Sequence, residues 1–387
     1  MQENVILIRY GEIYLKGKNR GMFEKILEKN ILSTLSTIPC KFERISGRYL
    51  VYDYEKKNES KIINKLTKVP GLYSISPAIA TETNDEFIRE LALEEMRDKM
   101  GTFKVDTNRA DKSFKYNSME YSRLLGEFIL ESGLGLSVDI HNPDTLLSID
   151  IRENGKTYIF TKIIMCCGGM PVSSAGNGLL LLSGGIDSPV AGFMMVKRGV
   201  KLSALHFESF PYTSRQAKEK TLELAKIISA YNGGITVYSC NIAKIQDAIH
   251  EHCDPDYMIT LVRRFMLRIA ERLAKEKGLM CLITGESLAQ VASQTMESIT
   301  TISSVLSGEL PFFRPLIGFD KSETIEISRK IGAYDISIRP YDDCCTVFLP
   351  KSPVTRPKLD RVRREENRID VKSLADEAYK NIEEIKL

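Results

Sequence analysis

The sequence contains no long hydrophobic run and no segment with the pattern of a signal peptide. Its longest apolar stretches, such as Gly178 to Leu182, are far shorter than the roughly 20 residues that cross a membrane as a helix. The first residues, MQENVILIRYGE, also lack a basic region followed by an apolar core. These absences favour a cytoplasmic protein with no membrane partner.

Metal-binding patterns are absent as well. No Cys-x-x-Cys pair occurs, and the four histidines are scattered along the chain. A zinc ribbon or an iron–sulfur cluster therefore has no support. In a reducing compartment, we expect the eight cysteines to be thiols and not disulfides.

A strong excess of positive charge is also missing. The formal net charge is +3, so the overall charge does not indicate a nucleic-acid-binding protein. If the chain binds RNA, its basic residues must be concentrated in a local patch.

The chain does contain enough hydrophobic residues, 43%, for several cores, and its 387 residues suit two or three domains. We predict α+β domains over residues 1–55 and 56–165. Residues 166–178 are rich in glycine, serine and proline and are typical of a linker. Residues 179–387 form the third predicted domain, of the α/β class.

The spacing of apolar residues places the expected elements. In the two α+β regions, strands are expected at 4–9, 48–53, 102–107, 146–152 and 157–164, and helices at 20–35, 62–67, 87–100 and 118–131. In the third region, strands at 179–182, 202–207, 235–239 and 280–284 alternate with helices at 188–198, 214–231 and 255–277. This alternation predicts a parallel, doubly wound sheet.

The most informative segment reads LLLLSGGIDSP. An apolar strand runs directly into Ser183, Gly184 and Gly185, and a helix follows from Asp187 and Ser188. The glycines permit a sharp turn close to a ligand. The helix start offers free N–H groups and the positive end of the helix dipole to an anion. The two serines can add hydroxyl donors, while Asp187 suits either a Mg²⁺ ion or a helix cap.

This segment differs from the two commonest phosphate-binding patterns. The chain has no complete Walker A pattern, Gly-x-x-x-x-Gly-Lys-Ser/Thr, and the glycines at 133 and 135 are too incomplete for a dinucleotide fingerprint. SGGxDS after an apolar strand is the PP-loop signature of enzymes that split ATP into AMP and pyrophosphate. Such enzymes activate a carbonyl oxygen as an adenylate ester, and the loop holds the departing pyrophosphate.

Longer segments resemble one family of RNA-modifying enzymes. They are RYGEIYLKGKNR, NPDTLLSIDIRENGKTYIF, SGGIDSPVAGFMMVKRG, HFESFPYTS, TGESLAQVASQT, RPLIGFDKSETIEISRKIG and PYDDCCTVFLPKSP. In this order and over essentially the whole chain, they resemble the tRNA 4-thiouridine synthetase family, which is also linked to thiamine biosynthesis. The resemblance implies a ferredoxin-like domain, a THUMP RNA-binding domain and a PP-loop ATP pyrophosphatase domain, which agrees with the three regions.

The resemblance also implies a set of nucleotide contacts: Leu181, Leu182, His206, Phe207, Arg263, Gly285 and Gln294. Most of them end neighbouring predicted strands, where doubly wound sheets bind ligands. Arg263 can pair with a phosphate in two-pronged fashion. Taken alone, Arg263 is equally consistent with an exposed helix arginine, and His206 with an ordinary polar residue.

Cys344 and Cys345 lie in a loop that carries the sulfur-bearing thiol in similar enzymes. We expect Cys345 to carry a persulfide, with Cys344 as its neighbour or substitute. A thiol with a reference pKa of about 8.5 is mostly protonated at neutral pH, so nearby positive charge is expected. Cys166 and Cys167 lie in the predicted linker and match no catalytic element.

Some relatives carry a rhodanese-like domain with a second active cysteine, whereas past the loop this sequence predicts only a basic, helical tail. We therefore expect a cysteine desulfurase to deliver persulfide sulfur directly to Cys345, and another thiol to resolve the product. The same observation gives less support to a role in thiamine synthesis. The resemblance adds the expectation of a homodimer.

Three groups of basic residues qualify as the local patch that RNA binding requires. The favoured group lies in the THUMP-like region and comprises Lys104, Arg109, Lys112 and Lys115, with Phe114 and Tyr116 available to stack on bases. The other two groups are Lys16, Lys18 and Arg20, and Arg356, Lys358, Arg361, Arg363 and Arg364.

These observations favour a tRNA sulfurtransferase that uses ATP and Mg²⁺, with Cys345, Cys344 and Asp187 as catalytic residues. The resemblance implies that the C4 oxygen of uridine 8 attacks the α-phosphate and that persulfide sulfur then displaces AMP to give 4-thiouridine. Two other interpretations are a PP-loop ligase that forms amides and an RNA-binding protein in which ATP is only structural. Release of pyrophosphate that depends on tRNA separates the three.

Overall fold

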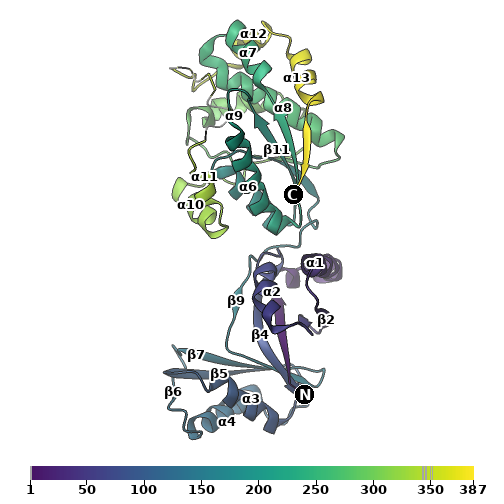
Figure 1. Cartoon of the computed structure of the whole chain (residues 1–387), viewed down its shortest axis with the longest axis vertical. Helices are drawn as coiled ribbons and strands as arrows, with labels where there is room; N and C mark the ends of the chain where they lie inside the picture. Colours follow the sequence, from purple (N-terminus) through teal and green to yellow (C-terminus); the bar gives the residue numbers. More distant parts are fainter. Residues whose placement is uncertain (1, 342–343, 345–346, 349, 351) are drawn as a thin grey trace. The chain divides into compact units, whose positions relative to one another are not determined.

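The computed structural model describes residues 1–387 with the exception of residues 1, 342–343, 345–346, 349 and 351. The expected sulfur carrier, Cys345, therefore lies outside the described residues. The chain forms two compact units, Met1–Met170 and Pro171–Leu387 (Figure 1). Their division falls within the predicted linker, residues 166–178. Across the described part of the chain, no helix combines the length and the apolar character needed to cross a membrane.

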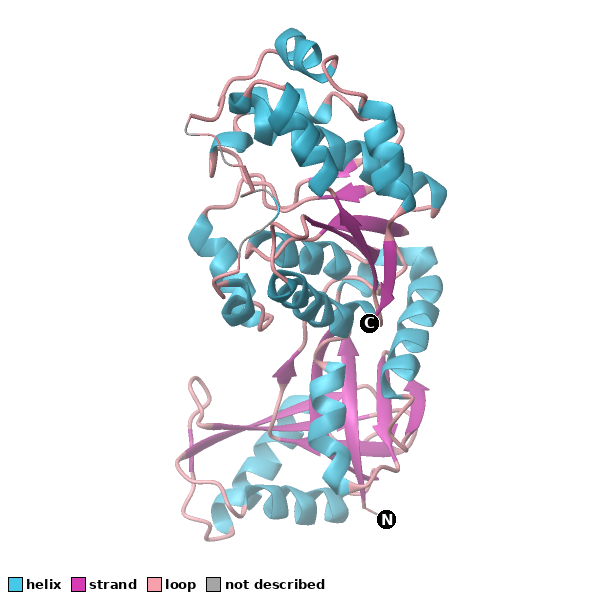
Figure 2. Cartoon of the chain, turned by 45° about the horizontal axis from the view of Figure 1, so that its top comes forward, coloured by secondary structure: helices cyan, strands magenta, loops and turns pink. Residues whose placement is uncertain are grey.

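Residues 2–170, all of which are described, build a nine-stranded sheet (Figure 2). Its strands are β1 (Glu3–Tyr10), β2 (Lys41–Ile45), β3 (Arg48–Tyr52), β4 (Leu72–Glu82), β5 (Thr102–Arg109), β6 (Ser137–Val138), β7 (Thr145–Ile151), β8 (Lys156–Phe160) and β9 (Ile164–Met165). The order is β2-β3-β1-β4-β8-β7-β5-β6, and β9 pairs with β4. The domain boundary expected near residue 55 stays a prediction, because this sheet continues across it.

Helices bury two separate cores against this sheet. They are α1 (Arg20–Leu35), α2 (Glu59–Leu66), α3 (Asp85–Met96) and α4 (Ser118–Glu131), with 3-10 turns at Glu12–Asn19 and Lys56–Asn58. Leu27 of α1 and Ile62 of α2 pack against β1, β3 and β4. Leu91 of α3 and Leu125 of α4 pack against β5 and β7. The helix predicted at 118–131 is confirmed, and Asn117 starts it with a reciprocal capping box.

The central strand β4 was not predicted. Its sequence LYSISPAIATE contains Pro77, and a proline within a run argues against a central strand. On one side β4 pairs with β1 along most of its length. On the other side, β9 pairs at Ser74 and Ile75 and β8 pairs from Ile79 onward. Pro77 falls between these two partners, so a residue without an N–H donor is tolerated where the pairing is interrupted.

The described residues of the second unit form a six-stranded sheet in the order β14-β13-β10-β11-β12-β15. Its strands are β10 (Asn177–Leu181), β11 (Lys201–Glu208), β12 (Thr236–Asn241), β13 (Leu282–Ile283), β14 (Phe312–Phe313) and β15 (Glu383–Lys386). Only the β12–β15 pair is antiparallel. The parallel, doubly wound sheet is confirmed, whereas β14 and β15 are too short or too polar for a hydrophobic pattern to reveal.

Helices cover both faces of this sheet (Figure 2). They are α5 (Asp187–Lys197), α6 (Arg215–Asn232), α7 (Ala243–His252), α8 (Met258–Glu276), α9 (Met296–Ser303), α10 (Lys321–Lys330), α11 (Tyr334–Ser337), α12 (Leu359–Glu366) and α13 (Val371–Lys380), with 3-10 turns at Pro255–Tyr257 and Ala292–Gln294. Leu180 of β10 faces α5, where Gly192 leaves room for it. Leu179 faces the other side and shares a core with Phe265 of α8. Because β11 and β13 flank β10 on opposite sides, the direction of winding changes at β10.

A buried ion triad ties α8 to α12. The Arg264 side chain donates to Glu366 from two nitrogens, at 2.9 Å each, and Arg268 approaches the same carboxylate at 2.6 Å. Arg264 and Glu366 are both buried. Burial alone would raise the pKa of Glu366, but the hydrogen bonds from Arg264 and Arg268 outweigh it and hold that pKa below its usual value.

We predict that Glu366→Gln lowers the free energy of unfolding by about 3–5 kcal/mol, because it leaves the buried Arg264 charge without a counterion. Since the folded-state pKa is lowered, the stabilisation is present at neutral pH and is lost as the pH falls below about 4. Urea unfolding followed by circular dichroism at pH 7 and pH 3.5 tests both statements.

Asp376→Asn is the matched control, because the Arg272–Asp376 pair is half-exposed on both sides. Its loss is expected to cost less than about 1 kcal/mol. Equal effects of the two substitutions at pH 7 would contradict the role given to Glu366.

Candidate nucleotide-binding site

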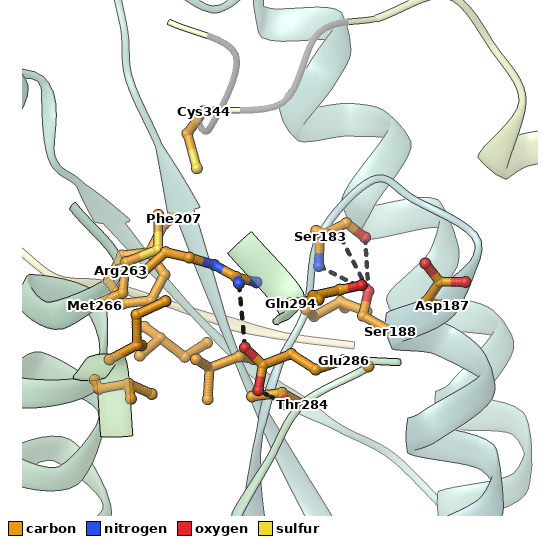
Figure 3. A pocket seen from close by; sticks show the side chains of 16 residues that line it. Ser183, Asp187, Ser188, Phe207, Arg263, Met266, Thr284, Glu286, Gln294 and Cys344 are labelled. Atoms are coloured by element: carbon orange, nitrogen blue, oxygen red, sulfur yellow. Dashed lines mark hydrogen bonds and ion pairs between the residues drawn. The ribbon is translucent and has the colours of Figure 1, made fainter. Parts of the chain in front are cut away.

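A cavity of about 180 Å³ lies at the carboxyl edge of the parallel strands, where the winding changes direction (Figure 3). The predicted site residues among those that line it are Leu181, Leu182, Ser183, Asp187, Ser188, Phe207, Arg263, Gly285, Gln294 and Cys344. Gly184, Gly185 and His206 lie beside the lining and not in it. The structure therefore brings together residues that are up to 163 positions apart in the sequence, from Leu181 to Cys344.

Hydrogen bonds between two serines close the phosphate loop, which we define as residues Ser183–Ser188. The N–H of Ser183 donates to Ser188 Oγ at 2.9 Å, and the two hydroxyl oxygens are 3.2 Å apart. The N–H of Gly185 donates to Ser183 Oγ at 3.3 Å. Ile186, the residue before α5, gives the helix no capping side-chain hydrogen bond. The N–H groups at the start of α5 thus remain available to an anion.

Asp187 has partners other than a metal. Its Oδ1 accepts from Lys321 Nζ at 2.7 Å, and its Oδ2 accepts from Gln290 Nε2 at 3.0 Å. The described residues contain no group of three or more His, Cys, Asp or Glu side chains arranged to hold a metal ion. Because both oxygens of Asp187 are engaged, the carboxylate fits a structural role in the loop better than a Mg²⁺ site, and Mg²⁺ at Asp187 stays a prediction.

Gly285 lets the end of β13 contact the phosphate loop directly. A Cβ atom at this position would lie 2.7 Å from the carbonyl carbon of Asp187 and from the N of Ser188. Real Cβ atoms do not approach a backbone so closely, so a side chain here must displace the loop. Packing alone therefore favours glycine at position 285, in addition to the nucleotide contact that the family resemblance implies.

Arg263 points into the cavity and is held by a buried carboxylate. Its Nη1 lies 3.2 Å from Glu286 Oε1 (Figure 3). Arg314 Nε lies 2.6 Å from Glu286 Oε2. One buried carboxylate thus orients two arginines, and the arrangement retains one net positive charge. Arg263 is not a freely moving surface arginine, which favours the phosphate-binding interpretation.

The other side of the cavity is apolar. Phe207, Met266, Leu267 and Ile302 contribute to the lining and suit a flat aromatic base. Gln294 is buried, and its Oε1 has no hydrogen-bond partner among the described residues. His206 is buried as well, with Nδ1 3.2 Å from the carbonyl oxygen of Leu182, so it acts on the site through the strand ends.

Two helices hold the cysteine loop, which we define as residues 339–348, with 342–343 and 345–346 outside the described residues. On α6, Lys220 Nζ donates to the carbonyl of Arg339 at 2.9 Å. On α7, Gln246 Nε2 donates to the carbonyl of Cys344 at 2.8 Å. The Phe348 ring stacks on His250 with centroids 4.4 Å apart. Figure 3 shows the Cys344 side chain directed toward the space between Arg263 and Ser183.

Burial keeps several other thiols protonated. It raises the pKa of Cys166 and of Cys240 to about 12, and that of Cys253 and of Cys281 to about 11. The sulfur of Cys253 donates to the carbonyl of Glu365 at 3.4 Å, and Cys240 and Cys281 also face carbonyl oxygens. These thiols are poor nucleophiles at neutral pH.

The residues favoured for RNA binding lie on or after β5. Lys112 and Lys115 are exposed, and Lys112 Nζ donates to the carbonyl of Arg109 at 3.2 Å. Arg109 in turn donates to the carbonyl of Phe114 at 3.0 Å and so supports the loop between β5 and α4. Phe114 and Tyr116 pack against Tyr121, with ring centroids 4.9 and 5.6 Å apart. These rings stabilise the loop and do not present both faces to bases.

Lys104, the fourth favoured residue, lines a separate cavity of about 770 Å³ between β5, β6 and α4. This cavity also contains the exposed apolar residues Met119 and Ile140. The structure therefore places Lys104 apart from the β5–α4 loop that carries Lys112 and Lys115.

A doubly wound sheet with an SGGxDS turn at its switch point defines a PP-loop ATP-binding unit. The family described as Thiamine biosynthesis protein (ThiI) matches residues 173–371. The chain belongs to this family. The ThiI ferredoxin-like domain matches residues 5–76 and the THUMP domain residues 85–162, in the order expected from the sequence.

Two related proteins match this chain over at least 97% of their length. The chain is 45% identical to the probable tRNA sulfurtransferase of Alkaliphilus metalliredigens, over 98% of this chain and 97% of that protein. It is also 45% identical to the probable tRNA sulfurtransferase of Caldanaerobacter subterraneus subsp. tengcongensis, over 99% of this chain and 100% of that protein. The crystal structure of a 4-thiouridine synthetase–RNA complex with bound ATP is 36% identical, covers 100% of both chains and has a TM-score of 0.90.

The residues that hold the site together were not predicted from the sequence. Lys321 stands in a quoted motif, GFDKSE, but its pairing with Asp187 spans 134 positions and cannot be read from the sequence. Glu286 directly follows Gly285 in TGES, and an acidic residue next to a predicted nucleotide-binding glycine is the sequence signal for it. Nothing in the helical pattern of α7 singles out Gln246 as a partner of Cys344.

We predict that Gly285→Ala weakens ATP binding at least about tenfold, because the added methyl group must displace the backbone of Asp187 and Ser188. Isothermal titration calorimetry measures the affinity, and circular dichroism checks the fold. Gly318→Ala in the same unit is the control, because a Cβ there meets no atom within 4 Å. Wild-type ATP affinity in the Gly285→Ala protein would refute the close-contact argument.

Proposed function

We propose that this chain is an ATP-dependent tRNA sulfurtransferase that converts uridine 8 to 4-thiouridine. The observation that carries the proposal is that the phosphate loop and Cys344 of the cysteine loop line one cavity. The reaction needs a site for the leaving pyrophosphate and a sulfur carrier within reach of the same carbon atom. The family membership and the names of the relatives support the same activity.

ATP fits this cavity in one orientation. Its base lies among Phe207, Met266 and Ile302, where the unpaired Oε1 of Gln294 can accept a hydrogen bond from the exocyclic amine of adenine. Its phosphates reach the start of α5, where free N–H groups and the helix dipole favour negative charge. Arg263, oriented by Glu286, neutralises charge near the α-phosphate.

The first step activates the uracil carbonyl. The C4 oxygen attacks the α-phosphorus of ATP, the bond to the β-phosphate oxygen breaks, and pyrophosphate leaves with that electron pair. The product is an adenylate ester at C4, whose AMP group leaves far more readily than the original oxygen. The serines and amides of the phosphate loop stabilise the charge that accumulates on the pyrophosphate.

The second step transfers sulfur. The terminal sulfur of a persulfide on Cys345 attacks C4 and AMP departs, which leaves Cys345 joined to the RNA through a disulfide. A second thiol attacks the Cys345 sulfur, forms a protein disulfide and releases 4-thiouridine, and a cellular dithiol then reduces that disulfide. A cysteine desulfurase supplies the persulfide sulfur. A homodimer remains an expectation from the family resemblance.

RNA binding is assigned to the first unit. The ferredoxin-like and THUMP matches lie there, and the related 4-thiouridine synthetase was solved as an RNA complex. Within this unit, Lys112 and Lys115 are exposed to solvent and can reach phosphates, whereas Arg109 is half-buried and supports its own loop.

The direct test is mass spectrometry of nucleosides from tRNA incubated with the protein, ATP and a cysteine desulfurase with cysteine. We expect 4-thiouridine, with one pyrophosphate and one AMP released per modified uridine. Formation of ADP, or AMP release without any thiolated nucleoside, would overturn the proposed function.

We predict that Cys345→Ser abolishes 4-thiouridine formation but leaves tRNA-dependent pyrophosphate release within about twofold of wild type, because only the second step needs the thiol. Cys344→Ser is the paired variant. Loss of sulfur transfer in Cys344→Ser with full transfer in Cys345→Ser would move the sulfur carrier to Cys344.

We predict that Lys112→Glu combined with Lys115→Glu weakens tRNA binding about tenfold or more at 100 mM salt and flattens its salt dependence, because phosphate contacts are replaced by repulsion. Filter binding measures the tRNA affinity, and ATP affinity is expected to stay unchanged. Lys25→Glu with Lys29→Glu, on the exposed side of α1, makes the same change in net charge. Equal losses in both double variants would show a general charge effect and argue against this surface.

A further inference from the structure

Lys220 on α6 is a buried lysine beside the phosphate loop. Its side chain is only 5% exposed, which is rare for lysine because burying an ammonium group is costly. A Cβ atom on Gly184 would lie 3.6 Å from Lys220 Nζ and 3.5 Å from its Cδ and Cε. The ammonium group therefore stands next to the loop backbone at a position where Gly184 has no side chain.

A hydrogen bond from the same ammonium group fixes the lysine in this place. Its Nζ donates to the carbonyl of Arg339 at 2.9 Å. The Arg339 guanidinium in turn pairs with Glu223, one turn further along α6, at 2.8 Å. Because α6 holds Arg339 at two points, the carbonyl that accepts the hydrogen bond from Lys220 is itself held, and the ammonium group is oriented before any ligand arrives.

The phosphate loop contains no cation of its own. Its sequence, Ser-Gly-Gly-Ile-Asp-Ser, carries one acidic and no basic residue, whereas a Walker A loop brings its own lysine to the phosphates. Lys321 comes from α10 and is directed to the Asp187 carboxylate, with its Nζ 2.7 Å from Asp187 Oδ1. Arg263 lies on the side of Glu286, toward the α-phosphate. A pyrophosphate group with several negative charges thus needs a cation at the Gly184 side of the loop.

We propose that Lys220 is that cation and that its ammonium group binds the pyrophosphate as it leaves. The inference rests on the proposed function, because only cleavage of ATP to AMP and pyrophosphate brings a free diphosphate to this loop. The bond between the α-phosphorus and the bridging oxygen breaks, its electron pair stays with the pyrophosphate, and Lys220 stabilises the charge that develops there. The step itself transfers no proton.

The test separates the two products of ATP cleavage. Isothermal titration calorimetry with pyrophosphate alone and with AMP alone is carried out on the full chain, wild type and Lys220→Gln. The variant removes the charge and keeps an amide donor, on a side chain that is one bond shorter than that of lysine. We expect pyrophosphate affinity to fall about tenfold to hundredfold and AMP affinity to stay within twofold.

Lys201→Met is the control for losing a less buried lysine elsewhere in the same unit. Lys201 is the first residue of β11, at the amino end of the strand and away from the cavity at its carboxyl end. Its Nζ donates to the carbonyls of Asn232, Gly233 and Gly234 at 2.6, 2.9 and 3.1 Å. This variant is expected to lower the melting temperature and to leave pyrophosphate affinity unchanged. A Lys220→Met protein, which lacks both charge and donor, is expected to lose pyrophosphate affinity as the glutamine variant does.

Each outcome decides the proposal. Wild-type pyrophosphate affinity in either folded Lys220 variant overturns it. Equal loss of AMP and pyrophosphate affinity, or failure of both variants to fold, assigns Lys220 a structural role and overturns it as well. A wild-type protein that binds neither pyrophosphate nor ATP would instead overturn the proposed function, so the two failures are distinguishable.

Discussion

The backbone contact between the end of β13 and the start of α5 is the constraint on which the nucleotide site depends. Because Gly285 has no side chain, the backbone at the end of β13 can lie directly against the Asp187–Ser188 peptide at the start of α5. This contact sets the position of the helix N-terminus relative to Glu286, one residue further along. Glu286 then orients Arg263 across the cavity. One missing methyl group thus fixes where the anion-binding amides and the guanidinium stand relative to each other.

Carboxylates in this site act mainly on the protein's own cations. Asp187 receives Lys321 and Gln290, Glu286 receives two arginines, and Glu366 receives Arg264 and Arg268 deeper in the unit. In each case the pair or triad holds a long, flexible side chain in one place. A basic side chain that is positioned in this way loses little rotamer entropy when a phosphate arrives. The arrangement is therefore prepared for phosphates before they bind.

Much of the fold could be predicted from the sequence, and the reasons differ between elements. The helix at 118–131 and the strands around the phosphate loop carry complete apolar patterns and clear start signals, so their positions follow from local chemistry. β4 escaped because Pro77 lies in a central strand at a gap between two partners, and β14 has only two residues. The cavity lining was largely anticipated from motifs. The partners of those residues were not, because the Asp187–Lys321 and Gln246–Cys344 contacts join distant segments and depend on the packing of whole helices.

An enzyme that carries persulfide sulfur must prevent the transfer of that sulfur to other thiols of the same chain. Persulfide sulfur passes between cysteines by attack of a thiolate, so any neighbour with an ordinary pKa is a route of loss. Cys240, Cys253 and Cys281 are withdrawn from this exchange twice over, by burial that keeps them protonated and by carbonyl oxygens that face the sulfur. Because these thiols stay protonated, they do not take up persulfide sulfur before it reaches the substrate.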